Sequence, residues 1–315
     1  MVQNTSLIAG IFLLLVGCIS LDPVSSAPQD IASDKPYYEK PQPELNGKFS
    51  LRGRVFSISA DGQIYFVDFK DQSIVRKANL QNHTLIDSFI DLKEWLKTEV
   101  PEKLQIDDLW IDLEGRLILA ESKTGKILRI SKDARKLENL ADSYDGFRLS
   151  RIQGLMGSRN GELFIGSPNT ATIYQFDTKS GKLLVLNENL IRPEDFATSS
   201  AGDRLLVAES WPNRIVVYDV NTSSPMRRSW DLIKFTKPQE RPLSIDFLDQ
   251  ESEVFAVLTA RGKKLQIFNL SKGKLVQEID LQVPCLRVRA YDEWIYLQTR
   301  KGIIRTKIPS NLKLL

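Results

Sequence analysis

The sequence predicts an all-β chain built as a six-bladed β-propeller with one short inserted helix. Two observations carry this prediction. A hairpin-type turn recurs six times from about residue 50 onward, and a second strand begins at a nearly constant distance behind each turn. With 42% hydrophobic residues in a chain of 315, there is also enough apolar surface for a large buried core.

Each repeat is marked by a turn of the Asp-Gly type between two short strands. Such a turn beside alternating apolar residues is the sequence signal of a β-hairpin. Successive turns lie 53, 46, 41, 50 and 40 residues apart, which is the length of three or four strands. The six turn positions are Gly62, Gly115, Gly161, Gly202, Ser252 and Asp292.

A second strand start follows each turn after 11 to 13 residues, so the length variation falls between the repeats. This is expected for blades joined by variable loops. A single four-stranded sheet cannot bury both of its faces, and consecutive sheets therefore stack and close into a ring. The six strand starts are Ile74, Ile127, Ile173, Ile215, Leu265 and Ile303.

Residues 48–310 are therefore expected to form the propeller. The last blade shows only three strands, so we expect the strand near Lys48–Leu51 to pair into it and close the ring. An amphipathic helix is predicted over 89–100, between the first two blades, with a cap at Asp87 or Ser88. This insertion accounts for the longest interval.

The amino-terminal residues 1–17 are predicted to be an export signal, because Leu7–Gly17 is an apolar run too short to span a bilayer. Cys18 follows a lipobox-like stretch, so two alternatives stay open: plain secretion, or a lipoprotein tethered through this cysteine. Residues 18–47 are rich in Pro and Ser and are predicted to be a flexible linker. The expected location is secreted or extracytoplasmic.

Charge and rare residues exclude several functions. Lys+Arg 43 against Asp+Glu 40 gives a net charge of +3, which does not favour nucleic-acid binding. His83 is the single histidine, so His-rich zinc sites are excluded, as is a His-containing triad unless His83 itself is the base; its polar surroundings favour a surface loop. Cys285 lies among apolar neighbours and is expected to be a buried, inert thiol. We expect a monomer without a cofactor.

Polar residues at the starts of the innermost strands are the candidate site, because these strands converge on one mouth of the channel. The ligand-binding candidates are Asp107, Arg151, Gln153, Glu194 and Asp195. Carboxylates are also ligands for Ca²⁺, so a cation site built by Asp107, Asp108 and Glu194 is an alternative. The third interpretation is that these carboxylates only accept backbone amide hydrogen bonds.

Two segments resemble a known group of propellers. Residues 192–210, RPEDFATSSAGDRLLVAES, followed by NRIVVYD at 213–219, are similar to the senescence-marker-protein/gluconolactonase/strictosidine synthase-like family, as are residues 272–284. The resemblance covers about residues 50 to 308 and implies the six-bladed fold. It also implies a divalent metal, usually Ca²⁺, at the mouth of those members that hydrolyse lactones.

Carried onto this chain, the family's metal ligands are mostly lost. The Glu of the first blade falls near Arg52, the Asn of the fourth at Glu194 and the Asp of the fifth at Leu243. The residues that hold substrate in such enzymes correspond to Arg151 and Gln153, which is a closer match. The resemblance thus implies the fold but a degenerate metal site.

Two functions follow from different classes. The first is a secreted or membrane-tethered module that binds a small molecule or a protein at its mouth, and the second is a divalent-metal-dependent lactonase or ester hydrolase with a variant site. Glu121 and Glu209 occupy equivalent places in two blades and are interpreted as repeat features. An exposed aromatic patch would favour protein binding, with these residues as candidates: Trp211, Trp230 and Trp294.

Overall fold

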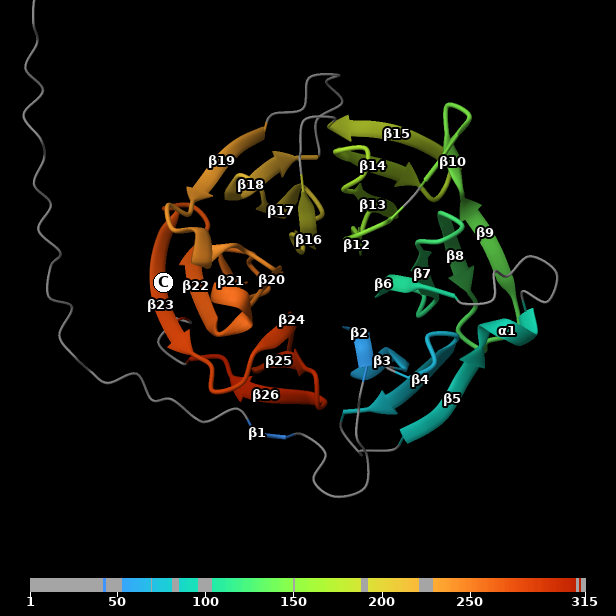
Figure 1. The fold of residues 1–315 in the computed structure, drawn as a ribbon, viewed down its shortest axis with the longest axis horizontal. Helices are drawn as coiled ribbons and strands as arrows, with labels where there is room; N and C mark the ends of the chain where they lie inside the picture. The colour runs from blue at the N-terminus through green and yellow to red at the C-terminus, as the bar shows by residue number, and fades with distance from the viewer. Residues whose placement is uncertain are drawn as a thin grey trace, which may run out of the picture. The chain divides into compact units, whose positions relative to one another are not determined.

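The computed structural model describes residues 42–43, 53–68, 70–80, 85–95, 104–149, 151–187, 192–220, 229–309 and 312. Within residues 38–315, six four-stranded antiparallel sheets are arranged around a common centre, as Figure 1 shows. The prediction of a six-bladed β-propeller is confirmed. The predicted export signal, Cys18, Arg52 and His83 lie outside the described residues.

Each of the first three blades is a meander whose strands run in chain order from the centre of the ring outward. Blade 1 contains β2 (Gly53–Ile58), β3 (Gln63–Asp68), β4 (Ile74–Asn79) and β5 (Leu85–Asp91). Blade 2 contains β6 (Ile106–Ile111), β7 (Leu117–Glu121), β8 (Lys126–Ile130) and β9 (Leu137–Ala141). Blade 3 contains β12 (Leu155–Gly157), β13 (Glu162–Ser167), β14 (Thr172–Asp177) and β15 (Lys182–Asn187).

The last three blades repeat this order, with one exception at the end of the chain. Blade 4 contains β16 (Pro193–Thr198), β17 (Arg204–Ser210), β18 (Asn213–Asp219) and β19 (Ser229–Lys234). Blade 5 contains β20 (Ser244–Phe247), β21 (Val254–Thr259), β22 (Lys264–Asn269) and β23 (Lys274–Asp280). Blade 6 contains β24 (Cys285–Tyr291), β25 (Trp294–Thr299), β26 (Ile303–Lys307) and, as its outer strand, β1 (Gln42–Pro43).

The strand β1 closes the ring by pairing with β26, with Gln42 opposite Arg305 and Pro43 opposite Ile304. Closure by an amino-terminal strand was predicted, but the observed strand lies earlier in the chain, inside the segment 18–47 that the sequence assigned to a linker. The predicted closing strand near Lys48–Leu51 lies outside the described residues. Proline is tolerated here because β1 is an edge strand.

The predicted helix begins later than expected. Phe89 belongs to β5, where its ring meets that of Tyr65 edge-on at 5.2 Å between centroids. The helix α1 (Leu92–Trp95) follows directly, with Leu92 buried, and residues 96–103 lie outside the described part. The prediction of a helix start at Phe89 is wrong because pairing with β4, through Asp91 opposite Ile74, extends the strand.

The six predicted turns have the conformation that their residues suggest. Gly62, Gly115 and Gly161 have φ of 72°, 75° and 86°, in the left-handed region that glycine enters without steric cost. Ser252 and Asp292 adopt the same region with φ of 58° and 55°. The turn geometry is therefore kept where the glycine is missing, which is why the repeat was detectable in all six blades.

The core lies between the blades. Middle strands are buried along their whole length, for example β7 and β21, and their apolar side chains pack against the neighbouring sheets. The cluster between blades 6 and 1 joins Tyr296 and Ile303 to Phe56 and Phe66, residues from opposite ends of the chain. Every sheet thus covers its faces with its neighbours, as a closed ring requires.

Alternating strand direction sorts the loops onto two faces. We call "mouth face" the side where the innermost strands β2, β6, β12, β16, β20 and β24 begin, and "far face" the side where they end. Loops between the second and third strand of a blade, and those between blades, lie on the mouth face. A hairpin of β10 (Ser143–Tyr144) and β11 (Phe147–Arg148) extends the connection from blade 2 to blade 3.

The other elements are short. Two 3-10 helices, η1 (Pro238–Glu240) and η2 (Ala260–Gly262), lie in loops on the mouth face. Among the residues that the structure describes, no helix has the length and apolar character needed to cross a membrane.

Candidate functional site at the channel mouth

A β-bulge at the start of an innermost strand separates neighbouring carboxylates. In β6, Ile106 pairs with Glu121 and Asp108 with Ala120, so Asp107 is the extra residue. The same irregularity in β16 makes Glu194 the extra residue before Asp195. Bulges of this kind redirect side chains beside functional sites. Here the bulged residue stays partly exposed at the rim of the mouth, whereas the next residue is buried.

Asp108 is fully buried and reaches two other blades. Its Oδ2 accepts a 2.8 Å hydrogen bond from the backbone N–H of Leu155 in blade 3. Its Oδ1 accepts a hydrogen bond from the guanidinium of Arg287 in blade 6 and one of 2.7 Å from the N–H of Leu109. Blade 6 and blade 2 are not neighbours in the ring, so the ion pair spans the channel.

Asp195 forms the second buried ion pair. Nη1 and Nη2 of Arg289 donate to its two oxygens at 2.9 and 3.0 Å, a bidentate geometry. Ser244 Oγ donates at 2.5 Å, and Nη2 of Arg287 lies 3.8 Å from Oδ1. Burial alone would raise the pKa of Asp195, but the positive charges of Arg289 and Arg287 hold it below the ordinary value.

Asp246 in β20 completes the cluster and behaves differently. Its Oδ2 accepts a hydrogen bond of 2.8 Å from the backbone N–H of Ala290, and its Oδ1 accepts one of 3.1 Å from the backbone N–H of its neighbour Phe247. Burial raises the pKa of Asp246 to about 6, and the negative charge of Asp195 adds to this, against the attraction of Arg289. Two guanidinium groups already balance two carboxylates, which leaves this third carboxylate without a full counter-charge.

These contacts act as ties between blades. Asp108, Asp195 and Asp246 each accept an amide N–H from the next innermost strand around the ring, from β12, β20 and β24 respectively. The interpretation in which aspartates accept backbone amides therefore describes Asp108 and Asp195 well. We call this set the channel cluster and define it as Asp108, Asp195, Ser244, Asp246, Arg287 and Arg289.

The rim carries the remaining predicted residues, and they do not converge into one group. Glu194 accepts hydrogen bonds from Ser210 Oγ at 2.6 Å and from the Arg241 guanidinium, and Arg192 Nε lies 3.1 Å away. Asp107 accepts two hydrogen bonds from the side-chain amide of Gln105, at 3.1 and 3.0 Å. Each rim carboxylate is held by neighbours from its own or the next blade.

The predicted substrate-holding residues lie in the connection to blade 3. Arg151 is exposed and has φ of 49°, in the left-handed region, and its backbone N–H donates to Ser122 at 3.4 Å. Gln153 is partly buried, and its backbone N–H donates to Gly166 at 2.8 Å. Both are on the mouth face, in the connection that leads into β12.

The buried carboxylates of the channel cluster do not suit a divalent cation. In the parts of the chain that the structure describes, no group of three Asp, Glu, His or Cys side chains is arranged to hold a metal ion. Leu243, where the family resemblance places an aspartate, offers only an apolar side chain. A cation such as Ca²⁺ takes six to eight oxygen ligands, whereas Asp108 and Asp195 already face guanidinium groups.

Glu121 and Glu209 are both buried and occupy equivalent positions in two blades, which agrees with their interpretation as features of the repeat. Glu121 ends β7 opposite Ile106, and Glu209 lies in β17 opposite Pro193, so the two positions are equivalent. Glu121 accepts the N–H of Thr124 at 2.7 Å and holds the following turn, and Glu209 forms an ion pair of 2.5 Å with Arg214. Both have structural partners within their own blade.

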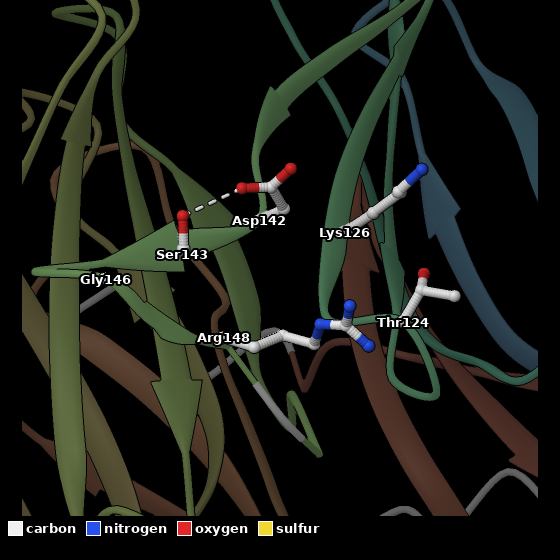
Figure 2. Close-up of a pocket in the computed structure, with 6 residues that line it drawn as sticks. All are labelled: Thr124, Lys126, Asp142, Ser143, Gly146 and Arg148. Carbon is white, nitrogen blue, oxygen red and sulfur yellow. Dashed lines mark hydrogen bonds between the residues drawn. The ribbon is translucent and has the colours of Figure 1, made fainter. Parts of the chain in front are cut away.

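A hollow of about 550 Å³ lies on the mouth face beside the β10–β11 hairpin. Figure 2 shows the side chain of Asp142 on one side of this hollow and those of Arg148 and Thr124 on another. The hydroxyl of Ser143 donates a hydrogen bond of 2.9 Å to Asp142. Its lining is Thr124, Lys126, Asp142, Ser143, Gly146 and Arg148. The Asp145-Gly146 turn of this hairpin, with φ of 49° and 79°, is a sequence signal that could have predicted it.

Sequence reasoning missed the arginines of the channel cluster. Arg287 and Arg289 lie in the strand CLRVRAY, where buried charged residues alternate with apolar ones. Charges in an innermost strand indicate partners in the channel, since a buried charge is retained only when it is paired. Cys285 is buried as predicted, and burial raises the pKa of its thiol to about 12.

Six closed antiparallel blades around a channel place this chain in the class of six-bladed propellers. The profile of the SMP-30/gluconolactonase/LRE-like region matches residues 55–290, and the chain belongs to this family. The comparison with curated protein sequences gives no match.

Solved structures with the same fold are distant in sequence. One named after gluconolactonase has 13% identity and a TM-score of 0.66, covering 86% of this chain and 93% of that chain. A luciferin-regenerating enzyme has 12% identity and a TM-score of 0.63, covering 86% and 95%. Virginiamycin B lyase from Staphylococcus aureus has 15% identity and a TM-score of 0.57, covering 80% and 92%. These values establish the fold alone.

Proposed function

We propose that this chain is an exported propeller that binds a ligand or a partner protein at its mouth face without a catalytic metal. The observation that carries the proposal is the neutralisation of Asp108 and Asp195 by Arg287 and Arg289. Exported here means secreted or extracytoplasmic, with Cys18 as the site of a lipid anchor if the signal is of the lipoprotein type.

The chemistry of arginine supports this proposal. A guanidinium keeps its proton at every physiological pH, so the positive charge in the channel cannot be removed by titration. Burial opposes the charge of Arg289, yet the facing carboxylates of Asp195 and Asp246 raise its pKa further. A divalent cation would have to displace a covalently attached cation before it reached either buried carboxylate.

One observation favours an alternative, a divalent-metal-dependent lactonase or ester hydrolase with a variant site. The chain belongs to a family whose description includes gluconolactonase, and the rim carboxylates Asp107 and Glu194 are partly exposed. A cation bound at the rim would use Asp107 or Glu194 rather than the channel cluster. The experiment must therefore distinguish the rim from the channel.

The test is calorimetric titration of the purified chain with calcium, manganese and zinc, read together with the thermal midpoint. We expect no binding heat and no rise in the midpoint, since a ligand specific to the folded state must stabilise it. Binding tighter than roughly millimolar with a raised midpoint would contradict the metal-free proposal and direct the work to lactone substrates.

Two variants locate any cation that does bind. Glu194→Gln removes a charge from the rim and would weaken a rim site, whereas it leaves the channel cluster intact. Arg287→Met frees Asp108 and is the positive control, because it opens a carboxylate that the wild-type chain keeps paired. Heat seen only in Arg287→Met would support the view that a guanidinium takes the place of a metal.

A further inference from the structure

On the mouth face, the loops that join the second and third strands are strongly basic, whereas the loops between blades also carry acids such as Asp142, Asp145 and Glu240. Each blade has one loop between its second and third strand, and the basic side chains of these loops are exposed. In the described residues of these loops, the only acidic residue is Asp71, which pairs with Lys93 at 2.7 Å. The basic residues are Lys70, Lys123, Arg261, Lys263, Arg300 and Lys301.

The far face has the opposite character near the channel. There the loops joining the first and second strands carry acids in five of the six blades, and their basic residues are Arg116 and Arg159. The acidic residues include Asp61, Asp112, Asp203, Asp249, Glu251 and Asp292. The small net charge of +3 does not reveal that basic and acidic loops lie on opposite faces. This separation of charge produces an electric field directed along the axis of the ring.

Large apolar side chains are exposed on the same basic face. Phe147, at the β10–β11 hairpin, is 77% exposed and Trp211, between β17 and β18, is 65% exposed. Val283 and Leu286 are exposed where blade 6 begins. In the described part of the chain, Leu113 is the one comparably exposed apolar side chain in a far-face loop.

The positions of these side chains indicate a flat partner. Phe147 lies by blade 2, Trp211 on blade 4 and Leu286 on blade 6, and Figure 1 shows these blades spread around the ring. They form no single patch, so a small ligand would touch one of them at a time. An extended surface is the kind of partner that can meet side chains on three separate blades, and tryptophan prefers the boundary between water and lipid.

The hollow on this face adds a site for a headgroup. Lys126, Arg148 and the hydroxyl of Thr124 line it, while Asp142, which accepts a hydrogen bond from the hydroxyl of Ser143, lies on another side. A phosphodiester carries one negative charge and accepts several hydrogen bonds, which is the chemistry that guanidinium and ammonium groups recognise.

We propose that the mouth face docks on an anionic lipid bilayer, with its basic loops against the phosphates and Phe147 and Trp211 at headgroup depth. This inference rests on the proposed metal-free binding function and names its partner. Basic residues near an anionic leaflet attract it over about a Debye length, and apolar side chains add the area that they bury.

The test is co-sedimentation with vesicles, using the chain with Cys18→Ser so that no lipid anchor contributes. Vesicles of phosphatidylcholine alone are compared with vesicles that also contain phosphatidylglycerol, in EDTA. We expect binding to the anionic vesicles only, weakened by salt. Equal binding to both, or binding to neither, would overturn the proposal.

Charge variants connect this binding to the face. Lys123→Glu, Arg261→Glu and Arg300→Glu together should reduce vesicle binding about one hundred-fold or more, since each basic residue near the surface contributes roughly five-fold. The matched control reverses three exposed lysines of far-face loops, Lys132, Lys179 and Lys272. A loss of similar size in this control would contradict an oriented face.

Apolar variants separate lipid from soluble polyanions. Phe147→Ser with Trp211→Ser should weaken vesicle binding several-fold, whereas Leu113→Ser, equally exposed on the far face, should not. If heparin binds as tightly as the vesicles and the Phe147 and Trp211 changes have no effect, the partner is a polyanion and the lipid proposal is wrong. Vesicle binding that requires calcium would instead contradict the metal-free function.

Discussion

Adjacent carboxylates in the bulged strands have opposite environments. Asp108 and Asp195 are buried and paired with arginines across the channel, whereas Asp107 and Glu194, one residue earlier, lie at the partly exposed rim. The sequence neighbours share charge and chemistry, so residue type does not distinguish them. The comparison teaches that a bulge decides which carboxylate is buried and stabilises the ring and which one stays at the rim.

The largest expected effect is on the buried side of this comparison. Arg289→Met leaves Asp195 and Asp246 without their main counter-charge and should lower the free energy of unfolding by about 3–5 kcal/mol. Urea titration measures it. Arg192→Met is the control, because that side chain is 44% exposed and should cost less than about 1 kcal/mol. Equal costs for the two would break the comparison.

A smaller effect is expected from the titration of Asp246. Its folded pKa of about 6 lies above the unfolded value, so its contribution to stability is fully present below about pH 4 and is lost as pH rises through 6. The free energy of unfolding should fall by about 1–2 kcal/mol over this range, which is less than the full pKa difference implies because Asp246 is partly exposed to solvent. Asp195, whose folded pKa is lowered, contributes in the opposite direction, with stability lost as pH falls.

Asp246→Asn isolates this titration. The amide resembles the protonated acid, and the variant should therefore lose the decline in stability between pH 4 and 6 while the acid-induced loss attributed to Asp195 persists. Thermal midpoints across this range measure the slope. A slope identical to that of the wild-type chain would show that Asp246 is not the group responsible.

The smallest effect is expected at the rim. Glu194→Gln removes one charge but keeps an acceptor for Ser210 and Arg241, so the free energy of unfolding should change by about 0–1 kcal/mol. The same urea titration applies. A cost close to that of Arg289→Met would mean that Glu194 belongs to the structural network and not to the binding rim.

The fold could be predicted from the sequence because its determinants are local. The turn at Gly62 and its five equivalents can be recognised from their residue types. The strands beside them begin at a nearly constant distance from each turn. The helix shows the limit of this reasoning. Phe89, Leu92 and Trp95 fit a helical period, yet the pairing of β5 with β4 takes Phe89 into the sheet.

The candidate site could be predicted only in part, because its contacts are not local. Topology was enough to place Asp107 and Glu194 at the mouth. The partner of Asp108 is Arg287, 179 residues away, and no spacing rule relates them. That ion pair depends on how the ring closes, which brings blade 6 across from blade 2.

The pairing of β1 with β26 has a consequence for the order in which the molecule can be assembled. The outer strand of the last blade comes from the first segment of the propeller, so five blades can form their sheets from consecutive sequence while the sixth waits for both chain ends. Contacts between such distant segments form slowly. A chain still growing at its carboxyl end therefore holds an open ring, with unpaired strand edges that other chains could use until the final strand arrives.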